Sequence, residues 1–220
     1  FRQLCGINGN VWPITLENDL QLCARLENGE TIVGEENVTD VRRPEVSSRL
    51  EKPLLTRDTE SRELATVTAN PLVLSAFANV DVIVLGPGSF FSSVLPHLMV
   101  AGVADELART NTPKIFVGNI REGNECYGWS VTELVNLFLG ICHEFACEKR
   151  DSKSYLTHII AHDSTTHSRN VKGDRYLETG DLARFRNEGI QITVADLEDP
   201  WKRGAHDANV LAQHIIDAGR

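Results

Sequence analysis

The sequence has few of the features that mark a membrane, nucleic-acid-binding or secreted protein. No apolar run approaches the roughly 20 residues that a membrane-spanning helix needs, and no stretch has the pattern of a signal peptide. Acidic residues outnumber basic ones by 31 to 22, and the formal net charge of −9 argues against a nucleic-acid binder, which normally carries a basic face. We therefore expect a cytoplasmic protein that binds neither membrane nor nucleic acid.

Cysteine is also scarce, and no cluster of metal ligands stands out. The five cysteines are scattered and odd in number, which suits reduced thiols better than a disulfide framework. Cys142 and Cys147 are five residues apart and do not share a helix face closely, so we interpret them as small core residues. His158 and His162 would lie roughly 13 Å apart on a strand, too far to share a metal. We predict no metal site from these residues.

What is present is the alternation of an α/β domain. At 220 residues the chain is long enough for one domain with its own core, and we expect a single domain over residues 1–220. Alternating strands and helices predict a mainly parallel sheet, covered by helices on both faces and joined by right-handed crossovers. We predict strands over residues 82–85, 114–119, 156–161 and 190–197, and helices over residues 70–79, 94–110, 131–148, 182–187 and 207–218.

The first 70 residues follow a different pattern. Apolar and polar residues alternate over residues 20–26, and Asn28-Gly29 is the strongest short hairpin signal in a sequence. We predict a β-hairpin over about residues 19–35. Residues 39–69 are polar and contain two prolines, which predicts a connection or a mobile excursion whose length suggests function or disorder.

The segment from Val80 to Ser93 has the sequence V-D-V-I-V-L-G-P-G-S-F-F-S-S, an apolar run followed by a glycine-rich turn and a helical pattern. Such a turn points backbone N–H groups and the positive end of a helix at one place, which suits a phosphate. Ser89, Ser92 and Ser93 add hydroxyl groups that can bond phosphate oxygens. The motif is neither a P-loop nor a dinucleotide fingerprint, and a tight turn whose serines only cap the helix is an equal alternative.

Polar residues also follow the other predicted strands. They are Asn119 to Glu125, His162-Asp163 and Asp196. In open parallel sheets ligands bind at the carboxyl ends of the strands, so we expect the site there. Ser89 lacks a Gly-x-Ser-x-Gly context and a paired base, which argues against a serine hydrolase.

Residues 81–98, D-V-I-V-L-G-P-G-S-F-F-S-S-V-L-P-H-L, resemble the signature of the gluconeogenesis-factor family, which shares a superfamily with 2-phospho-L-lactate transferase. In that family the segment is A-D-(apolar)-G-P-G-S-L-(Y/F)-T-S-(apolar)-P-N-L. The resemblance covers most of residues 9–135. Other segments that resemble the family are Trp12 to Thr15, Leu22 to Ala24, Asn28-Gly29, Gly34-Glu35, Asn119-Ile120 and Gly128 to Ser130.

The resemblance implies a Rossmann-like three-layer α/β/α fold with a mainly parallel sheet and an inserted β-hairpin. It also implies a phosphorylated, nucleotide-like ligand. Gluconeogenesis-factor members are linked to UDP-N-acetylglucosamine and to carbon and cell-wall metabolism. The transferase branch moves a phospholactyl-type group from a guanosine diphosphate carrier to a deazaflavin alcohol, using magnesium.

Three departures from the family pattern stand out. The family's opening strand and Gly-Gly-Gly-Thr-Gly loop would lie upstream of Phe1, so we expect the chain to be a fragment of a longer one. His97 stands where the family has asparagine. Arg121-Glu122-Gly123 replaces a methionine-threonine-glutamine-proline run.

Two functions therefore stand as alternatives, and a third is an interaction module whose site has decayed. In the first, a regulatory protein binds a nucleotide sugar or another phosphorylated small molecule. For its oligomeric state, a homodimer is kept as an alternative to a monomer. In the second, the chain is a transferase of phosphorus-containing groups, in which magnesium bridges the diphosphate and either Asp19 or Asp196. The sequence assigns no catalytic residue. The predicted ligand-binding residues are Gly86, Pro87, Gly88, Ser89, Ser92 and Ser93 for the diphosphate, and Asn119, Thr15 and Asn18 for the sugar or base.

Overall fold

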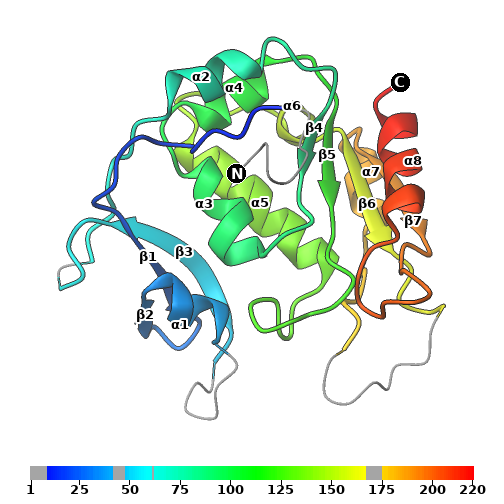
Figure 1. Cartoon of the computed structure of the whole chain (residues 1–220), viewed down its shortest axis with the longest axis horizontal. Helices are drawn as coiled ribbons and strands as arrows, with labels where there is room; N and C mark the ends of the chain where they lie inside the picture. The colour runs from blue at the N-terminus through cyan, green and yellow to red at the C-terminus, as the bar shows by residue number, and fades with distance from the viewer. Residues whose placement is uncertain (1–8, 42–47, 61, 167–174) are drawn as a thin grey trace.

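The computed structural model describes residues 9–41, 48–60, 62–166 and 175–220, and Figure 1 shows how their elements are arranged. A parallel sheet of four strands, in the order β4-β5-β6-β7, forms the centre of the larger part. Its members are β4 (Ile83–Leu85), β5 (Lys114–Val117), β6 (His158–His162) and β7 (Gln191–Ala195). The predicted parallel sheet is confirmed, and each strand pairs with the next one along the chain.

Helices cover both faces of this sheet. On one face, Phe116 and Ile159 share a core with Phe138 of α5 (Val131–Phe145) and with the buried residues of α3 (Leu95–Leu98), α4 (Val103–Arg109), α6 (Ser152–Tyr155) and α7 (Ala183–Asn187). On the other face, Ile115 and Ile160 pack with Leu211 of α8 (Ala208–Ala218). Figure 1 shows α3 and α5 on one side of the sheet and α8 on the other. The predicted Rossmann-like three-layer α/β/α fold is therefore confirmed.

A separate antiparallel sheet contains the predicted hairpin. Strands β1 (Gln21–Leu26) and β2 (Thr31–Val33) form that hairpin, and α1 (Glu35–Thr39) follows it. Within the expected connection of residues 39–69, however, β3 (Leu50–Thr56) pairs with β1. Pro53 and its charged neighbours argued against a strand in the sequence. However, β3 lies at the edge of its sheet, where a proline is tolerated. The expectation of an irregular connection is corrected to this extent, and its residues 42–47 and 61 lie outside the described ones.

The prediction of one continuous helix over residues 94–110 is wrong, because the structure has separate helical segments there. A π-helical turn, η1 (Phe90–Val94), leads into α3, and α4 begins only at Val103. Between them, the backbone N–H of Ala101 donates to the carbonyl of Val67 at 2.8 Å, which pulls the chain out of the helical path. This tertiary hydrogen bond leaves no trace in the local helical pattern.

The helix starts that depend on capping side chains are confirmed. Asn70 accepts a hydrogen bond at the start of α2 (Pro71–Ala76), Ser130 forms a capping box with Glu133 at the start of α5, and Asp207 caps α8. Strand β4 differs from expectation, because it lies at the edge of the sheet and leaves Val84 38% exposed rather than covered on both faces. Among the described residues, no helix is both long and apolar enough to cross a bilayer.

Candidate functional site

The glycine-rich turn after β4 is fixed against the end of β5. Gly86 has φ +90°, and a Cβ built on it would lie 2.7 Å from the carbonyl oxygen of Val117, so only glycine fits without strain. The peptide bond between Gly86 and Pro87 is cis. One residue further on, the side-chain amide of Asn119 donates to the carbonyl of Gly88 at 3.1 Å. The first two polar strand ends predicted from the sequence therefore do meet.

A cavity of about 530 Å³, which we call the basic cavity, opens between this turn and the loop that follows β7. Three of its side chains are cationic: Arg121, Lys202 and Arg203. In a chain of net charge −9, this local concentration of positive charge suits an anion. The lining residues are Pro87, Gly88, Asn119, Ile120, Arg121, Gly123, Lys202, Arg203, Gly204, Ala205 and His206.

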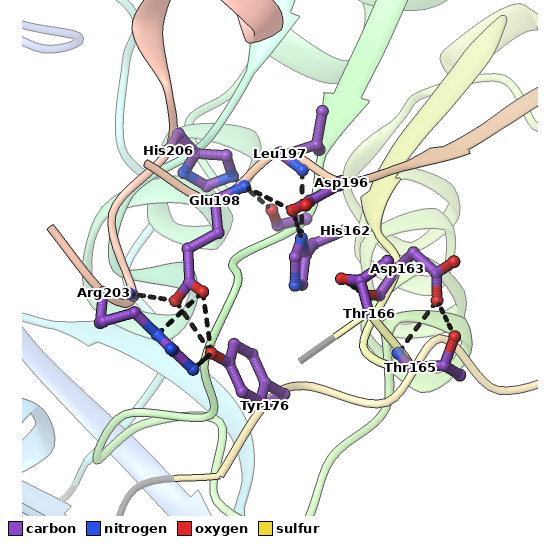
Figure 2. A network of polar contacts seen from close by, with 12 residues as sticks. His162, Asp163, Thr165, Thr166, Tyr176, Asp196, Leu197, Glu198, Arg203 and His206 are labelled. Atoms are coloured by element: carbon purple, nitrogen blue, oxygen red, sulfur yellow. Dashed lines mark hydrogen bonds and ion pairs between the residues drawn. The ribbon is translucent and has the colours of Figure 1, made fainter. Parts of the chain in front are cut away.

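The buried carboxylate of Glu198 holds one of these cationic side chains, Arg203, in place, as Figure 2 shows. Its side chain is 1% exposed and accepts hydrogen bonds from the hydroxyl of Tyr176 at 2.8 Å and from the backbone N–H of Gly204. Arg203 lies 3.1 Å from the same carboxylate and also donates to the Tyr176 hydroxyl, which raises the pKa of its guanidinium. Such a network fixes the orientation of the Arg203 guanidinium before any ligand binds.

Arg121 reaches the same carboxylate from the end of β5. Its Nη2 atom lies 3.9 Å from Glu198, and its guanidinium carbon lies 5.6 Å from the ring centre of Tyr176. Gly204 has φ +83°, and a Cβ there would collide with the Arg121 side chain. The backbone at Gly204 must therefore lie directly against Arg121, and this contact joins the ends of β5 and β7.

Two histidines complete the network, and one of them, His206, lines the cavity. His206 donates through Nε2 to the carbonyl of Gly118 at 3.1 Å, and burial lowers the pKa of its imidazole, so it is neutral near pH 7. The Nδ1 atom of the buried His162 accepts from the N–H of Leu197 at 3.2 Å and lies 3.6 Å from Asp196. Asp163 instead accepts from Thr165 in its own turn, and this hydrogen bond lowers the pKa of its carboxyl group.

The helix start after the glycine-rich turn is already filled by a carboxylate of the protein itself. Glu125, 7% exposed, accepts from the N–H groups of Phe91 at 2.8 Å and Ser92 at 3.1 Å, and from the hydroxyl of Ser92 at 2.6 Å. These are the donors that the sequence assigns to a phosphate. Ser89 is exposed and makes no side-chain cap hydrogen bond to the helix.

On its other side the turn borders an apolar cavity of about 410 Å³. Two of the predicted ligand-binding residues, Gly86 and Ser93, lie in its wall, and Pro87 and Gly88 line both cavities. Most of the remaining wall is apolar and includes Val84, Val94 and Leu98. An apolar wall of this kind does not favour a phosphate, because burying a charge without partners is costly.

Thr15 and Asn18 are placed away from the basic cavity. The Thr15 hydroxyl donates to the carbonyl of Thr68 at 2.7 Å, and Asn18 is exposed; neither residue lines the cavity. Nearby, Arg57 pairs with Glu17 and Asp19. This segment therefore ties the chain before β1 to the chain after β3.

The two carboxylates considered as alternative partners of magnesium lie in different parts of the fold. Asp19 pairs with Arg57 beside the small sheet, whereas Asp196 follows β7 of the large one. In the part of the chain that the structure describes, no group of three His, Cys, Asp or Glu side chains could hold a metal ion. The described residues therefore offer no metal site built wholly from protein side chains, whereas a magnesium ion held mainly by phosphate oxygens needs only one or two carboxylates.

Sequence reasoning missed the cationic part of the site and the carboxylates that organise it. It did not find Lys202, Arg203 or Glu198, and although Arg121 and Glu125 lie within the expected segment Asn119 to Glu125, it gave neither of them a role. One signal was available, because Lys202 and Arg203 follow a turn-forming Asp199-Pro200 just after a predicted strand, at the same edge as the other polar strand ends. No sequence pattern indicates that Glu125 folds back onto the helix start.

Comparison with known proteins finds similarity to one sequence family and to relatives that are named gluconeogenesis factors. A sequence model of the family described as 2-phospho-L-lactate transferase CofD matches residues 1–198. A Clostridium acetobutylicum protein with the provisional name gluconeogenesis factor is 28% identical over 221 residues, covering 96% of this chain and 44% of that protein. The gluconeogenesis factor of Halalkalibacterium halodurans is 25% identical over 142 residues, 64% of this chain and 40% of its own length.

Two crystal structures of a Bacillus halodurans protein share the fold, with TM-scores of 0.74 and 0.76 at 20% and 19% identity. Each comparison covers 97% of this chain and 64% of the solved chain. The chain thus spans less than half the length of the two curated relatives and under two thirds of the solved chains. The match over residues 1–198 shows that the chain belongs to the 2-phospho-L-lactate transferase CofD family, in which its named relatives are gluconeogenesis factors.

Proposed function

We propose that this chain binds the diphosphate of a nucleotide-type ligand in the basic cavity, as a gluconeogenesis-factor-like regulator of carbon or cell-envelope metabolism in the cytoplasm. One observation carries the proposal: Arg121, Lys202 and Arg203 line one cavity at the carboxyl edge of a parallel sheet, beside the glycine-rich turn. That edge is where open parallel sheets bind their ligands.

The chemistry of the wall fits a diphosphate in several ways. Arg121 and Arg203 present planar guanidinium groups, which match phosphate oxygens in a two-point contact. Lys202 adds a mobile point charge, and Asn119 adds an amide next to Gly88. In this proposal Gly88 keeps its predicted place beside the diphosphate, Asn119 moves from the sugar or base to the diphosphate, and the cations take over the role that the sequence gave to Ser92.

A nucleotide sugar such as UDP-N-acetylglucosamine is the ligand that we propose, because the named relatives are gluconeogenesis factors. The transferase alternative has the description of the matching family in its favour. Against it, the described residues contain no cluster of three metal-ligating side chains and no compact pair formed by Asp19 and Asp196. A turnover assay with the guanosine diphosphate donor, the deazaflavin alcohol and magnesium separates the two, since a binding protein forms no product.

Gly88 offers a sharp test of the binding proposal. A Cβ added at Gly88 meets no atom within 4 Å, so side chains fit there without displacing the protein. Gly88→Asp places a carboxylate at the cavity wall, and Gly88→Asn places a neutral side chain of the same shape. In isothermal titration calorimetry with UDP-N-acetylglucosamine, we expect Gly88→Asp to bind at least about thirtyfold more weakly than Gly88→Asn, because like charges about 4 Å apart repel by several kcal/mol.

The Lys202→Gln variant tests the same proposal in a second way, because it removes a positive charge from the cavity instead of adding a negative one. The Lys202 side chain is exposed, so we expect unchanged stability and roughly fivefold weaker binding, with a smaller dependence on salt. Equal affinities of the Gly88→Asp and Gly88→Asn proteins would refute the assignment of the diphosphate to this cavity.

A further inference from the structure

Trp201 is an aromatic side chain that the fold leaves in solvent beside the basic cavity. It is 95% exposed, the highest value among the large apolar side chains of the described residues. It directly precedes Lys202 and Arg203, both of which line the cavity. Tryptophan and arginine are enriched at binding sites because a large flat ring and a fixed cation make strong contacts when they become buried. An exposed tryptophan at this position therefore indicates a binding surface.

The loop that carries Trp201 is held by hydrogen bonds, so its exposure does not come from a loose chain. The Asp199 carboxylate accepts from the backbone N–H of Trp201 at 2.8 Å and from that of Lys202 at 3.2 Å. The N–H of Asp199 donates to the carbonyl of Ala205 at 2.8 Å, and a bridge joins Glu198 to His206. Trp201 is thus displayed by the same turn that presents the cations.

We propose that Trp201 is the platform on which the planar base of the nucleotide stacks while its diphosphate lies in the basic cavity. This inference rests on the proposed function and assigns the recognition of the base to one side chain. Trp201 is not part of the cavity wall itself, so in this arrangement the base stacks outside the cavity while the phosphates lie within it. Stacking tolerates different bases, since each has a π face.

Calorimetry with two probes, UDP and inorganic pyrophosphate, separates this inference from the proposed function. The proteins compared are the wild-type chain, Trp201→Ala, Trp201→Phe and, as a control with another exposed apolar residue, Ile216→Ala in α8. We expect Trp201→Ala to bind UDP roughly tenfold more weakly while its affinity for pyrophosphate stays within about twofold. Trp201→Phe should keep most of the UDP affinity, and Ile216→Ala should keep all of it.

Tryptophan fluorescence gives a second readout on the same proteins. UDP should quench the emission of the wild-type chain, and this change should be absent in Trp201→Phe even at ligand concentrations that saturate it. Unchanged UDP affinity in Trp201→Ala, with pyrophosphate still bound, would overturn the inference and leave the diphosphate site standing. Failure of the wild-type chain to bind either probe would overturn the proposed function and the inference with it.

Discussion

Two places beside the same glycine-rich turn are suited to an anion, and the protein treats them in opposite ways. At the start of η1, the N–H groups of Phe91 and Ser92 bind the carboxylate of Glu125, which belongs to the chain itself. On the other side of Gly88, Arg121 and Arg203 line a cavity of about 530 Å³. Similar local chemistry therefore gives a closed structural contact in one case and an open candidate site in the other.

The difference teaches that a helix start predicts affinity for negative charge but does not say where that charge comes from. The helix start receives an internal carboxylate, which stabilises the fold. The cavity is lined by cations instead, and the carboxylate that pairs with them, that of Glu198, is buried beneath it. The Glu198 side chain is 1% exposed and accepts hydrogen bonds from Tyr176 and Gly204. Three experiments can break or sharpen this comparison.

The largest expected effect is on the closed side, in Glu125→Ala. Removing this carboxylate leaves the buried N–H of Phe91 and the donors of Ser92 without their partner, and we expect a loss of about 3 kcal/mol in the free energy of unfolding, measured with urea. Glu125→Gln keeps the shape and one acceptor oxygen and should lose less. If Glu125→Gln instead raised the affinity for UDP-N-acetylglucosamine tenfold, the ligand would bind at the helix start, and the comparison would be wrong.

The next effect comes from the turn that separates the two places. Gly86→Ala puts a Cβ against the carbonyl of Val117 at φ +90°, so we expect about 2 kcal/mol of destabilisation. Gly88→Ala is the matched control, because its Cβ meets nothing within 4 Å, and its stability should change by less than about 0.5 kcal/mol. Thermal and urea unfolding of both proteins test this pair. Equal stabilities would mean that the turn is not fixed against β5.

The smallest effect is a pH dependence on the cavity side. The pKa of His206 is lowered from its ordinary value of 6.5 by burial, so the folded protein disfavours the proton that the unfolded chain takes up. The contribution of His206 to stability is therefore fully present above about pH 6.5 and is lost as the pH falls below it. His206→Gln should lose less stability than the wild type between pH 7.5 and pH 5.5. Identical pH dependence of the two proteins would contradict this role.

The elements that local chemistry specifies were predictable. The hairpin turn Asn28-Gly29, the helix start at Asn70, and the alternation of strands and helices each follow from nearby residues, and each is confirmed. Strand β3 and the break before α4 were not predictable in this way. Both depend on partners far along the chain, β1 in the first case and Val67 in the second.

By itself, the sequence determined the fold class and the family, because periodicity, capping and the glycine-rich motif are properties of neighbouring residues. It also predicted the edge of the sheet at which we propose the ligand binds. Only the tertiary structure decided which groups meet at that edge. Glu125 lies 34 residues from Phe91, and Arg203 lies 27 residues from Tyr176. Contacts over such separations depend on how the whole chain packs, and they determine that the helix start is closed while the basic cavity stays open.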